Sequence, residues 1–194
     1  MKYVGFWRRF GAYWLDIIAL SPLMALSIWG NENFRLFPLY LFIPSLLIGI
    51  WFYVYLVKKY GGTPGKLLLK IKIVKLNGQA VGYKEALLRY SVLFIFSTLL
   101  SLLLIITVLQ ISDSEYFSMN WQERGQYILH KASPWYFYIN IMLNIWIWSE
   151  FIVMLTNKQR RALHDFIAGT IVIQRKELSV DSESINQGET ITSI

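Results

Sequence analysis

Two carboxylates lie inside apolar stretches that are long enough to cross a lipid bilayer: Asp16 in the first stretch and Glu150 in the last. An ionised carboxylate at the centre of a membrane helix costs about 2.5–3.5 kcal/mol on insertion scales. Each acid therefore needs a counter-charge, a bound proton or contact with water. Because intramembrane carboxylates often mark ion pathways, these residues predict a cation- or proton-binding site. The alternative is an ion-pair cluster that only holds helix ends together.

Basic residues near the membrane surface are candidate partners for both acids. Arg9 precedes Asp16 by seven residues, so both side chains lie on one helix face, about 10 Å apart along the axis. Arg89 lies at the start of the third apolar stretch. Asp16 and Glu150 each lie about 9 Å below the same membrane surface, at a rise of about 1.5 Å per residue. The two acids are therefore predicted at one depth, where they could share a site.

Other compact motifs do not support an enzyme. The glycine-rich run at 61–66 is similar to a phosphate-binding loop, but position 60 is not glycine, and Leu67 follows the lysine where Ser or Thr is required. The two histidines, His130 and His164, are predicted on opposite sides of the membrane, and the chain has no cysteine. We therefore expect no enzymatic activity, no cofactor and no metal site. His164 is expected to orient Asp165 or to contact the backbone.

The elements that carry these residues are predicted to be transmembrane helices. The composition is 55% hydrophobic and 16% charged, whereas soluble domains carry about 25% charged residues. Pro22 and Pro44 interrupt the first two spans at similar depth, where kinks would widen the outer half of the bundle. The sequence thus predicts an all-α membrane protein, a bundle of four transmembrane helices at about residues 10–29, 36–57, 90–111 and 135–156.

The distribution of basic residues predicts the orientation. If the N-terminus is cytoplasmic, all but three of the 19 basic residues fall on the cytoplasmic side, the exceptions being Arg35, Arg124 and Lys131. This positive-inside bias places both termini in the cytoplasm. We expect a multi-pass protein of the inner membrane. The basic residues that give the net charge of +7 are therefore expected to contact the head groups of the lipid bilayer, and no nucleic acid partner is expected. Asp16 argues that the first span is retained and not cleaved as a signal peptide.

The segments between the spans have patterns of their own. Lys70–Ile73 alternates like a strand, Asn77-Gly78 is a hairpin turn signal, and Gln79–Gly82 is a candidate return strand. Thr170–Arg175 is also strand-like, so we expect a small cytoplasmic β-hairpin cap that joins these pieces. Two or three such strands are marginal alone, and the cap must rest on the helices.

Two further segments lie outside the spans. Ser112–Pro134 shows helical spacing of apolar residues, which favours a short helix on the outer surface, with an irregular loop as an equal alternative. Residues 178–194 are polar and are predicted to be a disordered tail that follows a membrane domain at 1–177.

Several of these residues resemble the motifs of the RDD family, small bacterial membrane proteins named for one arginine and two aspartates. Gly5–Asp16 looks like the opening motif, with Arg9 and Asp16 as the first two named residues, and Arg160–Thr170 looks like the closing motif, with Asp165 as the second aspartate. The resemblance covers about residues 3–175 and also includes Gly61, Gly62, Pro64, Gly65, Arg161, His164 and Gly169. Glu150 and the long outer segment have no counterpart in these motifs.

The resemblance implies a transport role, since sodium/proton antiport is proposed for some relatives, while others look like accessory or regulatory proteins. We therefore expect a cation or proton transporter, or a component of one, in which Asp16 binds Na⁺ or H⁺. Four short spans rarely enclose a full pathway, so a homo-oligomer is expected. The alternative is a non-transporting membrane scaffold or regulator that binds another membrane protein.

Overall fold

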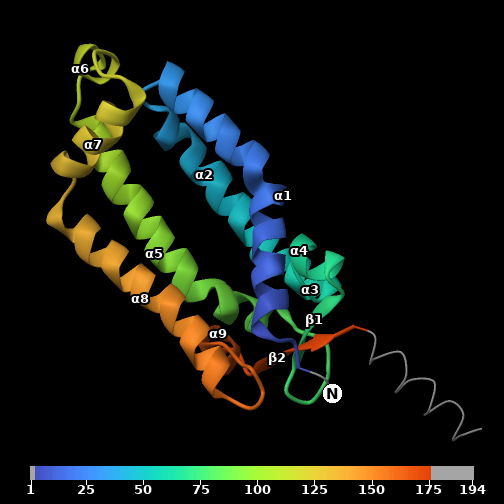
Figure 1. Ribbon diagram of the computed structural model, residues 1–194. Coiled ribbons are helices and arrows are strands. Elements are labelled where there is room, and N and C mark those ends of the chain that lie inside the picture. Colours follow the sequence, from blue (N-terminus) through green and yellow to red (C-terminus); the bar gives the residue numbers. More distant parts are fainter. Residues whose placement is uncertain (1–2, 176–194) are drawn as a thin grey trace, which may run out of the picture.

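The computed structural model describes residues 3–175, and the predicted tail at 178–194 lies outside them. Four helical segments of this part of the chain are long and apolar enough to cross a membrane (Figure 1). They are α1 (Phe6–Asn33), α2 (Phe37–Ile50) with its continuation, α5 (Tyr83–Leu109) and α8 (Pro134–Thr156). The predicted bundle of four transmembrane helices is therefore confirmed.

The helices extend beyond the apolar stretches from which they were predicted. α5 begins at Tyr83, because the Glu85 Oε2 atom accepts a hydrogen bond from the Gly82 backbone N–H at 2.8 Å and caps the first turn. α1 likewise includes the charged turn that contains Arg9. Hydropathy marks only the part of a helix that faces lipid, whereas backbone hydrogen bonding continues to the next cap.

The second span changes geometry before it leaves the bundle. α2 is followed by a π-helical turn, η1 (Trp51–Tyr55), and by α3 (Leu56–Tyr60). The chain then reverses at Gly61, whose φ of +81° favours glycine, and starts the short helix α4 (Pro64–Leu68). α4 packs against α1 (Figure 1).

The predicted β cap is present as a two-stranded antiparallel sheet. β1 (Ile71–Lys75) pairs with β2 (Thr170–Gln174), in a register that aligns Ile73 with Val172. The Asn77-Gly78 turn forms, but the candidate return strand contributes only an isolated bridge between Val74 and Ala80. The second strand thus comes from the end of the described chain, just after α9 (Leu163–Ile167).

The sheet joins three distant parts of the chain. The Val4 backbone N–H donates to the Val172 carbonyl at 3.1 Å, which ties the N-terminal segment to β2. Val4 and Val172 share a buried core with Ile71, Ile73 and Ala12. We call this end of the bundle, with α4, α9, β1 and β2, the sheet end. Its core explains how a sheet too small to be stable alone is held against the helices.

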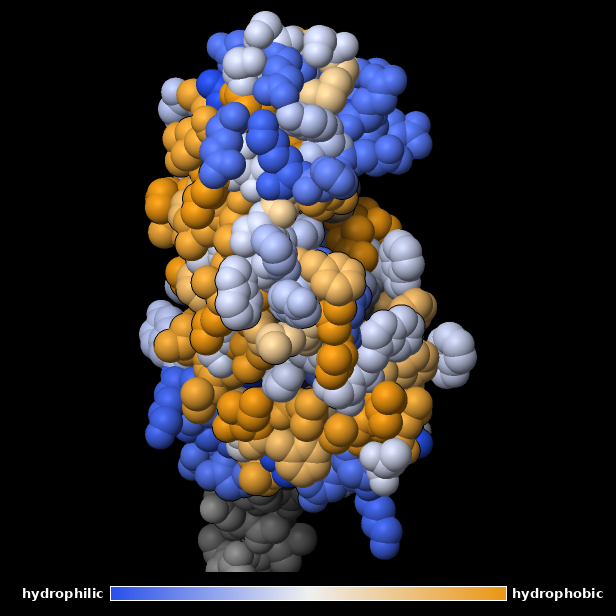
Figure 2. Space-filling model, turned by 90° about the vertical axis from the view of Figure 1, so that its left-hand side faces the viewer, coloured by the Kyte–Doolittle hydropathy of each residue, from blue (hydrophilic) through white to orange (hydrophobic). Residues whose placement is uncertain are grey.

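The opposite end, called the far end, carries α6 (Asp113–Phe117) and α7 (Trp121–Lys131). The helix predicted in this segment is therefore present, and the irregular-loop alternative is wrong. Arg124 fixes it in place by donating to the carbonyls of Asn31, Tyr116 and Met119. Figure 2 shows a belt of hydrophobic residues between the polar residues of the two ends, as expected of a protein embedded in a bilayer.

A cavity of about 320 Å³ lies between α1, α2 and α5 in the half of the bundle nearer the far end. Pro22 of α1 and Pro44 of α2 lie beside this half, which their kinks were predicted to widen. The lining is apolar apart from Ser27, Ser45 and Ser101.

Candidate functional site

The first buried charge lies where α4 meets α1. The side chain of Asp16 accepts a hydrogen bond from Thr63 Oγ1 at 2.6 Å and another from the Gly65 backbone N–H at 2.8 Å. Lys66 Nζ lies 3.9 Å from the Asp16 Oδ2 atom and donates to Thr63 Oγ1 at 3.2 Å. Asp16 is only 3% exposed. We call Asp16, Thr63, Gly65 and Lys66 the Asp16 cluster.

The local sequence explains this arrangement. Thr63 and Pro64 occupy the N-cap and first position of α4, where backbone N–H groups have no helical partner. The carboxylate of Asp16 supplies the missing acceptor from α1. Gly65 permits the close approach, because a Cβ atom there would lie 2.1 Å from the Ala12 carbonyl oxygen. α4 can therefore contact the backbone of α1 only with glycine at this position.

The second buried charge is Asp165 on α9. Its Oδ2 accepts from Arg9 Nη1 at 2.8 Å and from the Ala162 N–H at 3.0 Å, and its Oδ1 pairs with Arg89. Asp165 is fully buried, and Arg161 Nη2 donates to its backbone carbonyl at 3.0 Å. The two guanidinium groups come from α1 and α5, so one carboxylate joins three helices. We call Arg9, Arg89, Arg161, His164 and Asp165 the Asp165 cluster.

The charges around Asp165 determine its ionisation. Burial alone would raise the pKa of Asp165, but the neighbouring side chains of Arg89, His164 and Arg9 and the hydrogen bond from the Ala162 N–H outweigh it. The pKa of this carboxyl therefore lies below its ordinary value. Asp165 stays ionised at physiological pH.

The third acid, Glu150 of α8, contacts the Asp165 cluster through His164. Its Oε1 atom lies 2.6 Å from His164 Nδ1, while His164 Nε2 lies 3.6 Å from Asp165 Oδ1. Both Glu150 and His164 side chains are 22% exposed. This contact between Glu150 and His164 links the end of α8 to α9.

Two sequence-based expectations about these charges are therefore wrong. Arg9 pairs with Asp165 and not with Asp16, because two residues seven apart on one helix are separated by about 10 Å along its axis. Asp16 and Glu150 do not share a site. Asp16 is hydrogen-bonded to the turn before α4, whereas Glu150 contacts His164. Equal depth in a membrane does not fix which neighbouring segment each side chain faces.

Sequence reasoning did not assign Thr63 and Lys66 to a site. The Thr-Pro pair is a signal for a helix start, and a helix start offers free N–H groups to an anion. That signal could have pointed to a carboxylate partner, but not to Asp16 in particular.

The other motif residues surround the same two clusters. Gly169 has a φ of +62°, which turns the chain from α9 into β2. Gly62 is buried in the turn that presents Thr63, and Arg161 Nε donates to the Thr170 carbonyl at 3.1 Å. The motifs that are distant in sequence thus meet at the sheet end. Among residues 3–175, no group of three or more His, Asp or Glu side chains is arranged to hold a metal ion.

The family model described as RDD family matches residues 3–169. No curated protein and no solved structure matches the chain significantly.

Proposed function

Because the chain belongs to the RDD family and has four membrane-spanning helices, we propose that it is a component of a cation or proton transporter in which Asp16 is the ion-binding group. The observation that carries the proposal is the position of Lys66. Its ammonium group lies beside the buried Asp16 carboxylate, at 3.9 Å, without a direct hydrogen bond.

A buried carboxylate has to be neutralised, and in this cluster Lys66 is the adjacent cation. A Na⁺ ion or a proton at Asp16 supplies the same neutralisation. The carboxylate and the Thr63 hydroxyl are oxygen ligands, which hard cations prefer. Binding of Na⁺ or H⁺ then releases Lys66, and release of the ion restores the contact. This exchange is the step that we propose for transport.

The Asp165 cluster is less suited to the same task. Its carboxylate faces two guanidinium groups, which do not lose their protons in proteins. Its pKa lies below the ordinary value, so it does not take up a proton near neutral pH. This comparison supports Asp16 as the exchangeable acid and Asp165 as the structural one.

Flux measurements test the proposal. Purified protein in proteoliposomes is expected to move Na⁺, K⁺ or H⁺ down an imposed gradient. Asp16→Asn should reduce the flux at least tenfold, and Lys66→Gln should change its dependence on ion concentration, because the competing cation is gone. Asp113→Asn is the matched control, since Asp113 forms an exposed ion pair with Arg35 at the far end. Wild-type vesicles without any ion flux, or full flux in the Asp16→Asn variant, would refute the proposal.

A second candidate function is a non-transporting scaffold or regulator that binds another membrane protein. It is favoured by the fact that both oxygens of Asp16 accept hydrogen bonds from the chain itself. The sheet end also carries exposed basic side chains, namely Lys58, Lys59, Lys70 and Lys84. Purification in mild detergent should then return one dominant membrane protein, which is lost when Lys58, Lys59 and Lys70 are replaced by Glu. Absence of a reproducible partner would count against this function.

A further inference from the structure

Of the four spans in the described part of the chain, α8 is the least buried. Met154 alone is buried among the α8 residues, all of which the structure describes, whereas α5 buries five residues along its length. α8 packs along α5, meets α9 through Glu150 and His164, and touches the start of α1 through Phe151, whose ring is 5.6 Å from that of Phe6. Most of its surface thus remains available to other molecules in the membrane.

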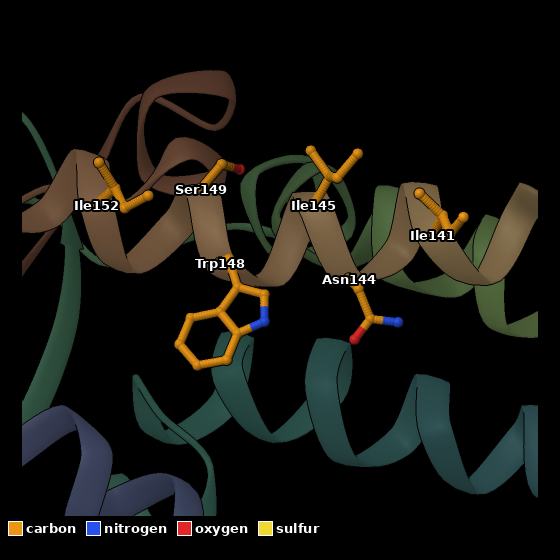
Figure 3. A pocket seen from close by; sticks show the side chains of 6 residues that line it. All are labelled: Ile141, Asn144, Ile145, Trp148, Ser149 and Ile152. Atoms are coloured by element: carbon orange, nitrogen blue, oxygen red, sulfur yellow. The ribbon is translucent and has the colours of Figure 1, made fainter.

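A groove of about 430 Å³ lies on this exposed face (Figure 3). Its walls come from α8 alone: Ile141, Asn144, Ile145, Trp148, Ser149 and Ile152. Figure 3 shows Asn144 and Trp148 on one flank and the isoleucines and Ser149 on the other. The face therefore combines apolar side chains with a projecting tryptophan and a carboxamide.

The carboxamides of Asn140 and Asn144 make this face unlike an ordinary lipid-facing surface. Asn144 Nδ2 donates to the Asn140 carbonyl at 2.8 Å and to Asn140 Oδ1 at 3.0 Å. Within residues 3–175, no other helix provides a hydrogen-bond partner for either side chain. Acyl chains provide none either, so the Asn144 oxygen and the Asn140 amide protons lack partners in a bilayer.

We propose that a second copy of this chain covers the groove, with α8 packed against α8 and the asparagine pairs in contact. A carboxamide is both donor and acceptor and is complementary to itself. A two-fold axis along the membrane normal brings each Asn144 to the depth of its counterpart. The residues that line the groove carry no charge, so two copies meet there without repulsion. The inference is independent of whether Asp16 binds an ion.

Cysteine cross-linking tests the interface in the full-length chain, which contains no cysteine of its own. Ile145→Cys places a thiol in the groove, and Ile95→Cys on α5 is the matched control, since Ile145 and Ile95 are 62% and 54% exposed. In phosphatidylethanolamine/phosphatidylglycerol vesicles, oxidation should yield a dimer of the Ile145→Cys chain and little of the Ile95→Cys chain. The dimer should persist as lipid is added, whereas products of chance collision decrease.

A second comparison tests the asparagines. Replacing Asn140 and Asn144 by Leu in the Ile145→Cys chain should weaken dimerisation about tenfold, because the buried hydrogen bonds are lost while the apolar contact remains. Equal cross-linking of the two single-cysteine chains, or an unchanged dimer with the leucines, would overturn the proposal. The proposal would also be overturned if, in cell membranes, the Ile145→Cys chain formed a cross-linked product whose mass shows that a different protein occupies the groove.

Discussion

Replacement of Asp165 by Asn tests whether the buried ion pairs hold the bundle together. The substitution keeps the size of the side chain but removes the negative charge that Arg9 and Arg89 share. These side chains are 10% and 8% exposed, so water does not replace the lost partner. The positive charges of both guanidinium groups then remain buried without the negative charge of Asp165 beside them.

The expected loss follows from this burial. Removing one partner of a buried ion pair costs about 3–5 kcal/mol, because the remaining charge stays desolvated. The Asn oxygen can still accept one hydrogen bond, so we expect the Asp165→Asn loss in free energy of unfolding to lie within this range, although two pairs are broken. Asp113→Asn is the control, because its carboxylate also pairs with an arginine but is 72% exposed. That change should cost less than about 1 kcal/mol.

The assay is unfolding of the purified protein in mixed micelles, followed by the fluorescence of its 8 tryptophans. The unfolding midpoint of the Asp165 variant should shift strongly, and that of the Asp113 variant hardly at all. A loss below about 1 kcal/mol for Asp165→Asn, or an equal loss for both variants, would show that the cluster does not hold the helices together.

The remaining predictions concern pH, packing and topology. Despite burial, the positive charges around Asp165 keep its pKa below the ordinary value. The ionised carboxylate therefore stabilises the fold fully above about pH 4, and this contribution is lost as the pH falls further. Measurements of the unfolding free energy at decreasing pH should show this loss in the wild type and much less of it in Asp165→Asn. Gly65→Ala should destabilise by roughly 1–3 kcal/mol or more, because its Cβ would overlap the Ala12 carbonyl. Gly125→Ala, where nothing lies within 4 Å, should stabilise α7 by about 0.5–1 kcal/mol in the same assay. An impermeant thiol reagent should label a cysteine in α7 from outside the cell and one in the α3–α4 turn only after lysis; the reverse pattern would contradict the positive-inside prediction.

The pattern of the sequence was sufficient for the architecture. Length and hydropathy predict four spans, because a helix has to satisfy its backbone hydrogen bonds internally wherever lipid surrounds it. Alternating residues at 70–73 and the β-branched run at 170–175 predict two strands, and the structure pairs strands from these two segments in the cap. The same reasoning marked Asp16 and Glu150 as unusual, because a carboxylate at membrane depth requires a partner whatever the fold. Asp165 lies outside the predicted spans and was singled out only by the resemblance of its motif.

The identity of each partner was decided only by the tertiary structure. The seven-residue spacing of Arg9 and Asp16 suggested a pair within one helix, yet Arg9 extends to α9 and Asp16 caps α4. Periodicity gives the face of a helix on which a side chain lies, but not the segment that packs there. That choice depends on contacts between residues far apart in the chain, such as the approach of Gly65 to α1 and the joining of three helices at Asp165.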